Sequence, residues 1–167
     1  NKYVEAEKAF RRAIDIDPKY AFAWCNLGVV LGHQEKHADA EMAYKRAIDI
    51  DPLDADYWYN LGNALHGQDR YAGAEEAYKR AIDFDPQYAD AWNNLGVVLG
   101  YQNKYGEAEE AYKRAIDINP QYSFPWNNLG NALDDQDKYA EAAARAMRQE
   151  CQTMSNNVSI SCAIPAN

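Results

Sequence analysis

The chain of 167 residues has a formal net charge of −9 and a sequence pI of about 4.8. This excess of acids argues against a nucleic-acid partner, because phosphate binding requires a basic surface. Hydrophobic residues make up 47% of the chain, too much apolar surface to remain solvated, so we expect a folded protein. The mean hydropathy is −0.67 and no apolar run is long enough to span a bilayer, so we expect no direct membrane insertion.

The three cysteines bear on the compartment. Cys25, Cys151 and Cys162 are odd in number and lack CxxC spacing, so they form no disulfide framework. Their pattern favours a reducing compartment inside the cell, such as the cytoplasm, the nucleus or an organelle stroma. The first residues already have the pattern of a helix, which leaves a targeting segment upstream, and the localisation itself, open.

A 34-residue period organises the sequence up to about residue 148. Residues 55–88 and 89–122 are identical at 22 of 34 positions, which chance does not produce. The marks that recur in step are Trp24, Trp58, Trp92 and Trp126; Gly28, Gly62, Gly96 and Gly130, each after a leucine; Ala40, Ala74, Ala108 and Ala142; Tyr44, Tyr78 and Tyr112; and Pro52, Pro86 and Pro120.

Each period predicts a pair of helices. In the first helix Trp24 and Leu31 lie on one face, and in the second Ala40 and Tyr44 share a face, as the 3.6-residue period requires. We expect Gly28 opposite Ala40, where its missing side chain lets the two helices approach closely.

Turns are expected at two places in every period. Residues 34–36, Gln-Glu-Lys, predict the turn within a helix pair. Asp51-Pro52 predicts the turn between pairs, because proline cannot continue the preceding helix.

This pattern resembles the tetratricopeptide repeat, whose signature is W-x2-L-G…A-x3-F…A…P over 34 residues, with tyrosine here in place of the phenylalanine. The resemblance implies an all-α fold, an α-solenoid in which antiparallel helical hairpins stack into a right-handed superhelix. It also implies that the chain binds a protein or peptide in a concave groove lined by the first helices.

The two ends depart from the repeat. The first helix lacks a first-helix partner in this chain, so we expect Phe10, Ala13 and Ile14 to be uncovered and open to a partner or to edge-to-edge self-association. In the last repeat Ala146 replaces the aromatic residue, and we expect the Ser/Asn-rich tail to be extended or disordered. The predicted units are a partial repeat at 1–20, full repeats at 21–54, 55–88 and 89–122, a degenerate repeat at 123–150 and the irregular tail at 151–167.

Within the implied groove, asparagine occupies the same position of every repeat, at Asn26, Asn60, Asn94 and Asn128. Its amide both donates to and accepts from a peptide backbone, so the row predicts binding of an extended chain through its backbone, independent of the side chains of that chain. It resembles the asparagine ladder in the tetratricopeptide superhelix of O-linked N-acetylglucosamine transferases. The alternative is that asparagine is common at this position and was copied by duplication.

A two-repeat alternation overlies the row. Val29 and Val97 occupy one groove position in the first and third repeats, whereas Asn63 and Asn131 occupy it in the second and fourth. This alternation either sets the spacing of pockets along a bound chain or is an inherited, silent feature. The candidate peptide-binding residues are Asn26, Asn60, Asn94, Asn128, Asn63, Asn131, Tyr59, Asn93, Asn127, Asp56, Asp90 and Tyr101.

Groove charges predict the class of partner. Asp56, Asp90, Asp134 and Asp135 are acidic, and only histidines could be cationic there, so the groove should favour a neutral or basic segment and not an acidic tail. The Lys-Arg pairs at 45–46, 79–80 and 113–114 are expected on the solvated convex face, paired with glutamates one turn earlier.

Catalytic and metal-binding patterns are missing from the sequence. The histidines have no H-E-x-x-H spacing, and no phosphate-binding loop or nucleophile elbow occurs, so we expect no enzyme, no metal and no cofactor. Three functions remain open. The first is a scaffold that binds a peptide in the groove, the second is a structural subunit that uses its edges and convex face, and the third is the recruiting arm of an enzyme whose catalytic domain lies elsewhere.

Overall fold

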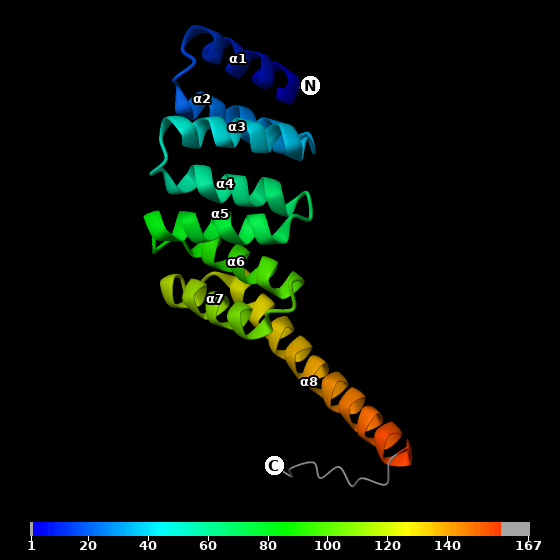
Figure 1. The fold of residues 1–167 in the computed structure, drawn as a ribbon. Coiled ribbons are helices and arrows are strands. Elements are labelled where there is room, and N and C mark those ends of the chain that lie inside the picture. Colours follow the sequence, from blue (N-terminus) through cyan, green and yellow to red (C-terminus); the bar gives the residue numbers. More distant parts are fainter. Residues whose placement is uncertain (1, 158–167) are drawn as a thin grey trace.

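A computed structural model describes residues 2–157, except for the side chains of residues 139, 142, 143, 145, 146 and 149–157. Across this range the chain is a stack of α-helices without a strand, which confirms the all-α solenoid (Figure 1). The helices are α1 (Lys2–Ile16), α2 (Ala21–His33), α3 (His37–Ile50), α4 (Ala55–His66), α5 (Tyr71–Phe84), α6 (Ala89–Tyr101), α7 (Tyr105–Ile118) and α8 (Ser123–Asn157).

Three hairpins form the body of the stack: α2 with α3, α4 with α5, and α6 with α7. Their turns contain Glu35, Asp69 and Asn103 in the left-handed region, with φ of 61°, 57° and 60°. In the first turn the N–H of Lys36 donates to the carbonyl oxygen of Leu31 at 3.0 Å, which closes the carboxyl end of α2. The turn predicted at residues 34–36 is therefore confirmed.

A tyrosine ring, not an alanine, covers the glycine of each hairpin. A Cβ added to Gly28 would lie 2.5 Å from Cε1 of Tyr44, and Gly62 and Gly96 meet Tyr78 and Tyr112 in the same way. The expectation that Gly28 faces Ala40 was wrong because the helices are antiparallel. Gly28 lies one turn further from the hairpin turn than Leu31, so it faces the residue one turn beyond Ala40.

The signature tryptophan and proline hold the connections between hairpins. Each indole Nε1 donates to the proline carbonyl oxygen six residues earlier, which ties the start of a first helix to the turn before it. The four bonds are Trp24 to Pro18 at 3.0 Å, Trp58 to Pro52 at 2.8 Å, Trp92 to Pro86 at 3.1 Å and Trp126 to Pro120 at 3.2 Å.

A glutamate on α3 and another on α5 reach the turn of the following hairpin. The carboxylate of Glu75 accepts from Nε2 of Gln102 and Nζ of Lys104, both at 2.8 Å. Glu41 makes the same contacts with Gln68 and Arg70. These bonds join neighbouring repeats, on whose contact the stability of a solenoid depends.

The last repeat is one continuous helix and not a hairpin. Helix α8 runs from Ser123 to Asn157, and its second half projects away from the stack (Figure 1). The degenerate hairpin expected over 123–150 does not form, and residues 151–157 are helical where an irregular tail was expected; residues 158–167 lie outside the described range. The sequence has Ala146 where the earlier repeats have the tyrosine that packs on the glycine of the first helix, so no ring is available to hold a second helix against α8.

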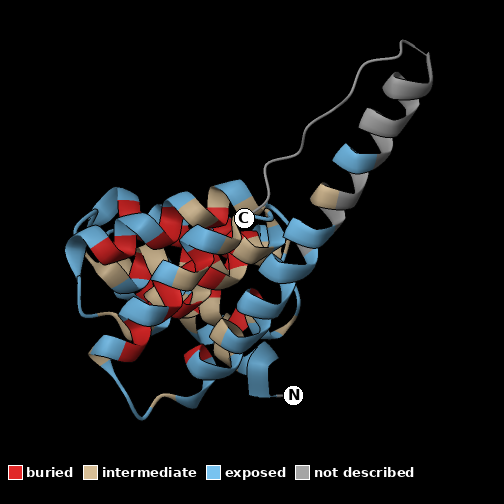
Figure 2. Ribbon diagram, turned by 90° about the horizontal axis from the view of Figure 1, so that it is seen from below, coloured by how far each residue is buried: buried red, intermediate tan, exposed pale blue. Residues whose placement is uncertain are grey.

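This continuous helix leaves one face of α8 uncovered. A Cβ on Gly130 would meet nothing within 4 Å, and Leu133 is 43% exposed, although its equivalents in the earlier repeats are buried. Trp126 is 53% exposed. Figure 2 shows that the buried residues are concentrated in the stack of helices. The projecting part of α8 lies outside this stack (Figure 1).

Helix α1 packs on α2 through Ile14, which is buried. Phe10 and Ala13 are half-buried. The expectation that Ile14 is uncovered was wrong, because it occupies the register of Ile48 and Ile82, both of them buried core residues. Over residues 2–157, no helix combines the length and the apolarity that crossing a membrane requires.

Candidate peptide-binding groove

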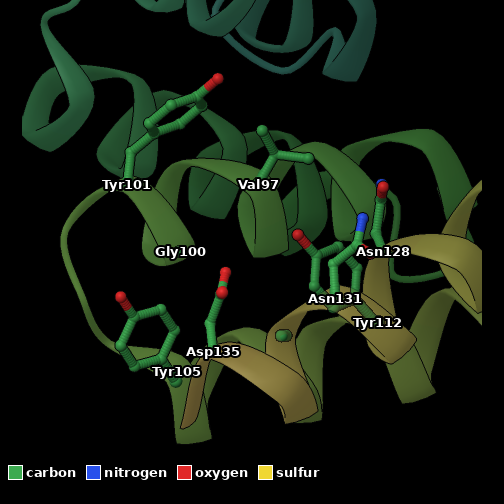
Figure 3. Close-up of a pocket in the computed structure, with 9 residues that line it drawn as sticks. Val97, Gly100, Tyr101, Tyr105, Tyr112, Asn128, Asn131 and Asp135 are labelled. Atoms are coloured by element: carbon green, nitrogen blue, oxygen red, sulfur yellow. The ribbon is translucent and has the colours of Figure 1, made fainter. Parts of the chain in front are cut away.

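Two cavities of about 300 Å³ each open along the first helices. The N-terminal cavity lies among α2, α3 and α4, and the C-terminal cavity among α6, α7 and α8 (Figure 3). We call the surface that carries both cavities and the asparagine row the groove. Residues two repeats apart line the two cavities. The shared positions are Val29 and Val97, Gly32 and Gly100, His33 and Tyr101, His37 and Tyr105, Tyr44 and Tyr112, Asn60 and Asn128, Asn63 and Asn131, and Ala64 and Ala132.

Small residues on the first helices keep these cavities open. A Cβ added to Gly32 or Gly100 would meet nothing within 4 Å, so the glycines leave empty space where any other residue would project. Val29 and Val97, both half-buried, contribute short apolar walls beside them.

Between the cavities the same register is filled. His66 replaces the glycine, and its ring lies 6.0 Å from that of Tyr71 and 5.7 Å from that of Tyr101. Burial lowers the pKa of His66, which favours the neutral imidazole. Asn63 replaces the valine and accepts from the hydroxyl of Tyr78 at 2.8 Å. The two-repeat alternation in the sequence is therefore an alternation between open and filled positions in the groove.

The asparagine row is hydrogen-bonded along the solenoid. Nδ2 of Asn60 donates to Sγ of Cys25 at 3.7 Å, Nδ2 of Asn94 to the hydroxyl of Tyr59 at 3.2 Å, and Nδ2 of Asn128 to Oδ1 of Asn93 at 3.0 Å. Each donor reaches back to the preceding repeat. The amide N–H groups thus join repeats. Oδ1 of Asn60 and of Asn128 are therefore the acceptors best suited to a ligand, whereas Oδ1 of Asn94 already accepts one bond from Asn93 and has one lone pair left. Asn26, first in the row, is half-buried.

Asn93 lies inside the fold. It is 5% exposed, its Nδ2 donates to Oδ1 of Asn94 at 3.0 Å, and its Oδ1 accepts from Asn128. Its amide is committed to the contact between repeats. The residue at the same register in the last repeat, Asn127, is exposed. Cys25, which takes this register in the first repeat and is buried, was the sequence signal that the position faces inward.

Tyr59 and the two aspartates of the groove have aromatic neighbours. The ring of Tyr59 lies 4.8 Å from that of Tyr88, and Oδ1 of Asp56 accepts from the hydroxyl of Tyr88 at 2.7 Å. Burial, together with this bond, raises the pKa of Tyr88. Tyr122 repeats the arrangement with Asp90, since burial and a hydrogen bond to Asp90 raise its pKa too. Tyr88 and Tyr122 lie 34 residues apart, so the repeat pattern could have identified them. Neither was among the candidate peptide-binding residues.

Tyr101 is the most exposed aromatic residue of the C-terminal cavity, at 60%. Its ring stacks on Tyr71 with centroids 4.7 Å apart and planes 5° apart, so it is held in place although it faces solvent. Figure 3 shows Tyr101, Tyr105 and Asp135 at one end of this cavity, with Asn128 and Asn131 at the other. Tyr105 and Tyr112 were not among the candidate residues.

The Lys-Arg pairs lie outside both cavities. Their lysines contact glutamates one helical turn earlier, at 2.7 Å for Lys45 and Glu41, 2.6 Å for Lys79 and Glu75, and 2.5 Å for Lys113 and Glu109. The expected pairing along the second helices is therefore confirmed. Over the described part of the chain, no group of three or more His, Cys, Asp or Glu could hold a metal ion.

Models of the tetratricopeptide repeat match the chain over residues 1–55 and 25–89, over 89–122 and over 111–144. The first of these models alone covers more than half of the sequence. The chain belongs to the tetratricopeptide repeat family. No curated protein matches it in sequence.

Solved structures show the same tetratricopeptide fold. The crystal structure of MamA has a TM-score of 0.77 at 26% identity, over 92% of this chain and 91% of that one. The first tetratricopeptide domain of Spaghetti (RPAP3), bound to the HSP90 peptide SRMEEVD, has a TM-score of 0.70 at 22% identity, over 72% and 96%. The OM64 domain of Arabidopsis has a TM-score of 0.66 at 19% identity, over 67% and 93%. Family and neighbours support a protein-interaction scaffold.

Proposed function

We propose that this tetratricopeptide repeat chain holds an extended, neutral or basic segment of another protein in the groove. The observation that carries the proposal is the pair of matched cavities beside a row of amide oxygens. A peptide backbone in the groove would donate its N–H groups to Oδ1 of Asn60, Asn94 and Asn128, and its side chains would enter the cavities. Asn26, Asn63, Asn131, Asn127, Tyr59 and Tyr101 would contribute further contacts.

Charge favours a neutral or basic segment over an acidic one. Asp56, Asp90, Asp134 and Asp135 are exposed acids on the first helices, and no Lys or Arg is among the described residues that line either cavity. The RPAP3 domain holds a peptide that ends in Glu-Glu-Val-Asp. A segment of that kind would meet like charges here without a compensating cation. We propose no catalytic role for the chain.

The uncovered face of α8 supports a second candidate, assembly into a larger complex. Trp126 and Leu133 are exposed there, and Leu129 is half-buried. An exposed apolar face of this kind is typical of an interaction surface. A partner seated on α8 would use the edge of the solenoid and not the groove.

Peptides selected by display from random twelve-residue sequences separate the two candidates. We expect Val97→Lys, which fills a cavity wall, to weaken binding of the selected peptides at least about tenfold in fluorescence polarisation. Met42→Lys, at an exposed site on α3, should leave the affinity unchanged. Thermal melting of each variant checks that the fold is intact.

Loss of binding in Leu133→Ser with full binding in Val97→Lys would overturn the groove proposal in favour of the α8 face. Equal binding by all three variants would overturn both candidates.

A further inference from the structure

The two cavities have equal volumes and are lined largely by equivalent repeat positions, but their chemistry differs. His33 and His37 border the N-terminal cavity, where no Asp or Glu is among the described lining residues. Tyr101 and Tyr105 replace them in the C-terminal cavity, and the carboxylate of Asp135 joins the lining. Figure 3 shows that carboxylate at the same end as the two tyrosines.

This difference separates the side chains that the cavities suit. Aromatic rings beside a carboxylate attract a guanidinium or ammonium group, through the face of the ring and through charge. The C-terminal cavity therefore suits Arg or Lys. The N-terminal cavity combines Val29, Ala40 and Tyr44 with the two imidazoles, which suits an uncharged aromatic or aliphatic side chain.

The solenoid fixes how far apart these side chains lie. Helix α2 contacts α4, and α6 contacts α8, so the two first helices that border each cavity lie side by side. The repeat of the solenoid gives α4 and α6 the equivalent placement. Packed helices lie about 10 Å apart, which places cavities two repeats apart at a separation of about 20 Å. An extended peptide advances about 3.3 Å per residue, so this distance corresponds to about six residues.

The filled position between the cavities enforces this spacing. His66 occupies the place of Gly32 and Gly100, and Asn63 is held by hydrogen bonds from Tyr78 and Asn94. A side chain three residues from either anchor would meet this filled surface and project to solvent. The groove thus offers two places for side chains instead of one in every repeat.

We infer that the groove selects a segment with an apolar or aromatic residue and an Arg or Lys about six positions apart, the first in the N-terminal cavity and the second in the C-terminal cavity. The inference rests on the proposed function, because it names which segment the groove holds. It does not follow from the family fold, since the alternation of Gly32, His66 and Gly100 belongs to this sequence.

Because histidine stands at the middle register, as His66, substitution of the two equivalent glycines by histidine tests the inference. Gly100→His and Gly32→His each introduce the side chain that already fills the middle register, at sites where a Cβ has open space. Gly106→His is the matched control, because Gly106 also has nothing within 4 Å and lines neither cavity. Thermal melting of the three variants tests that each is folded.

The probes are twelve-residue Ala/Ser peptides with one Phe and one Arg separated by three, six or nine positions, and a version with Glu in place of Arg. Binding is followed by amide NMR shifts of the full chain. We expect the six-residue spacing to bind about tenfold more tightly than the other spacings or the Glu version. Gly100→His and Gly32→His should each abolish the preference for the six-residue spacing, and Gly100→His should also abolish the advantage of Arg over Glu. Gly106→His should change neither.

Equal binding at all spacings, with shifts still confined to the groove, would overturn this inference and leave the proposed function standing. The same holds if Gly106→His weakens binding as much as Gly100→His. Shifts confined to the exposed face of α8, or no shifts at all, would overturn the inference and count against the proposed function as well.

Discussion

At the scale of single residues, three glycines set how closely the helices of each hairpin approach. The ring of Tyr44, Tyr78 or Tyr112 fills the space that a side chain on the facing glycine would occupy. Tyr78 has no exposed surface, so its ring has no room to move aside. Gly130 has the same place in the last repeat, but nothing faces it.

Gly62→Ala and Gly130→Ala form a matched pair of variants. We expect Gly62→Ala to lower the free energy of unfolding by about 1–3 kcal/mol, because the added methyl overpacks against Tyr78. Gly130→Ala should raise it by about 0.5–1 kcal/mol, because alanine is the better residue in an open helix. Urea unfolding measures both. A loss of stability in Gly130→Ala would mean that a second helix does pack on α8.

Single residues also show what the sequence could not tell. The asparagine row was found from its period alone, but its donors bond to Cys25, Tyr59 and Asn93 of the preceding repeats. The 34-residue period shows which residues are equivalent, but it does not show which side chains each of them contacts. For the same reason Asn93 was included among groove residues although its side chain is buried.

At the scale of helices, the carboxylate contacts between repeats hold neighbouring hairpins together. Burial opposes the charged form of Glu75, but hydrogen bonds from Lys104, Lys79 and Gln102 outweigh it and lower its pKa from 4.5 to about 2. The pKa of Glu41 is lowered against the same opposing burial by bonds from Lys45 and Gln68. Glu109, the next in register, makes the same contact with a lysine of its own helix, Lys113, but α8 has no turn from which a second repeat could reach it.

These contacts predict a dependence of stability on pH. A carboxyl whose pKa is lowered by folding stabilises the fold above its unfolded pKa, and this stabilisation is lost as pH falls towards the folded value. Glu75→Gln should therefore lower the free energy of unfolding by about 1–2 kcal/mol at pH 7, and the deficit should shrink as the pH falls from 4.5 towards 2. Urea titrations at a series of pH values measure it, with Glu76→Gln, exposed on the same helix, as the control. A deficit that does not change with pH would contradict this role.

Helix α8 is the element whose secondary structure the sequence pattern predicted wrongly. The decay of the repeat after Tyr139 was visible in the sequence, and it suggested a poor hairpin followed by an irregular tail. The missing tyrosine instead favours continuation of the helix, since alanine, arginine and glutamate support it through residue 150. A degenerate second helix and a continuous first helix have similar sequences. They differ in whether the segment packs back on the first helix, and the repeat pattern does not show that.

At the scale of the whole molecule, the solenoid could be predicted almost completely because it is one unit repeated. Trp24, Gly28, Tyr44 and Pro52 mark the contacts of one hairpin, and the 34-residue interval repeats them through the chain. The cavities could be foreseen only in part. The alternation of valine and asparagine was evident, but its effect on open space depends on Gly32 and Gly100 and on the residues that face them.

The central claim is that this solenoid holds an extended segment of another protein in the groove. The crystal structure of the full chain with a display-selected peptide tests it most directly. We expect the peptide to lie extended across the first helices, with backbone N–H groups on Oδ1 of Asn60, Asn94 or Asn128 and side chains in the two cavities. A peptide seated on the convex face or on the exposed face of α8, with the cavities empty, would contradict the claim.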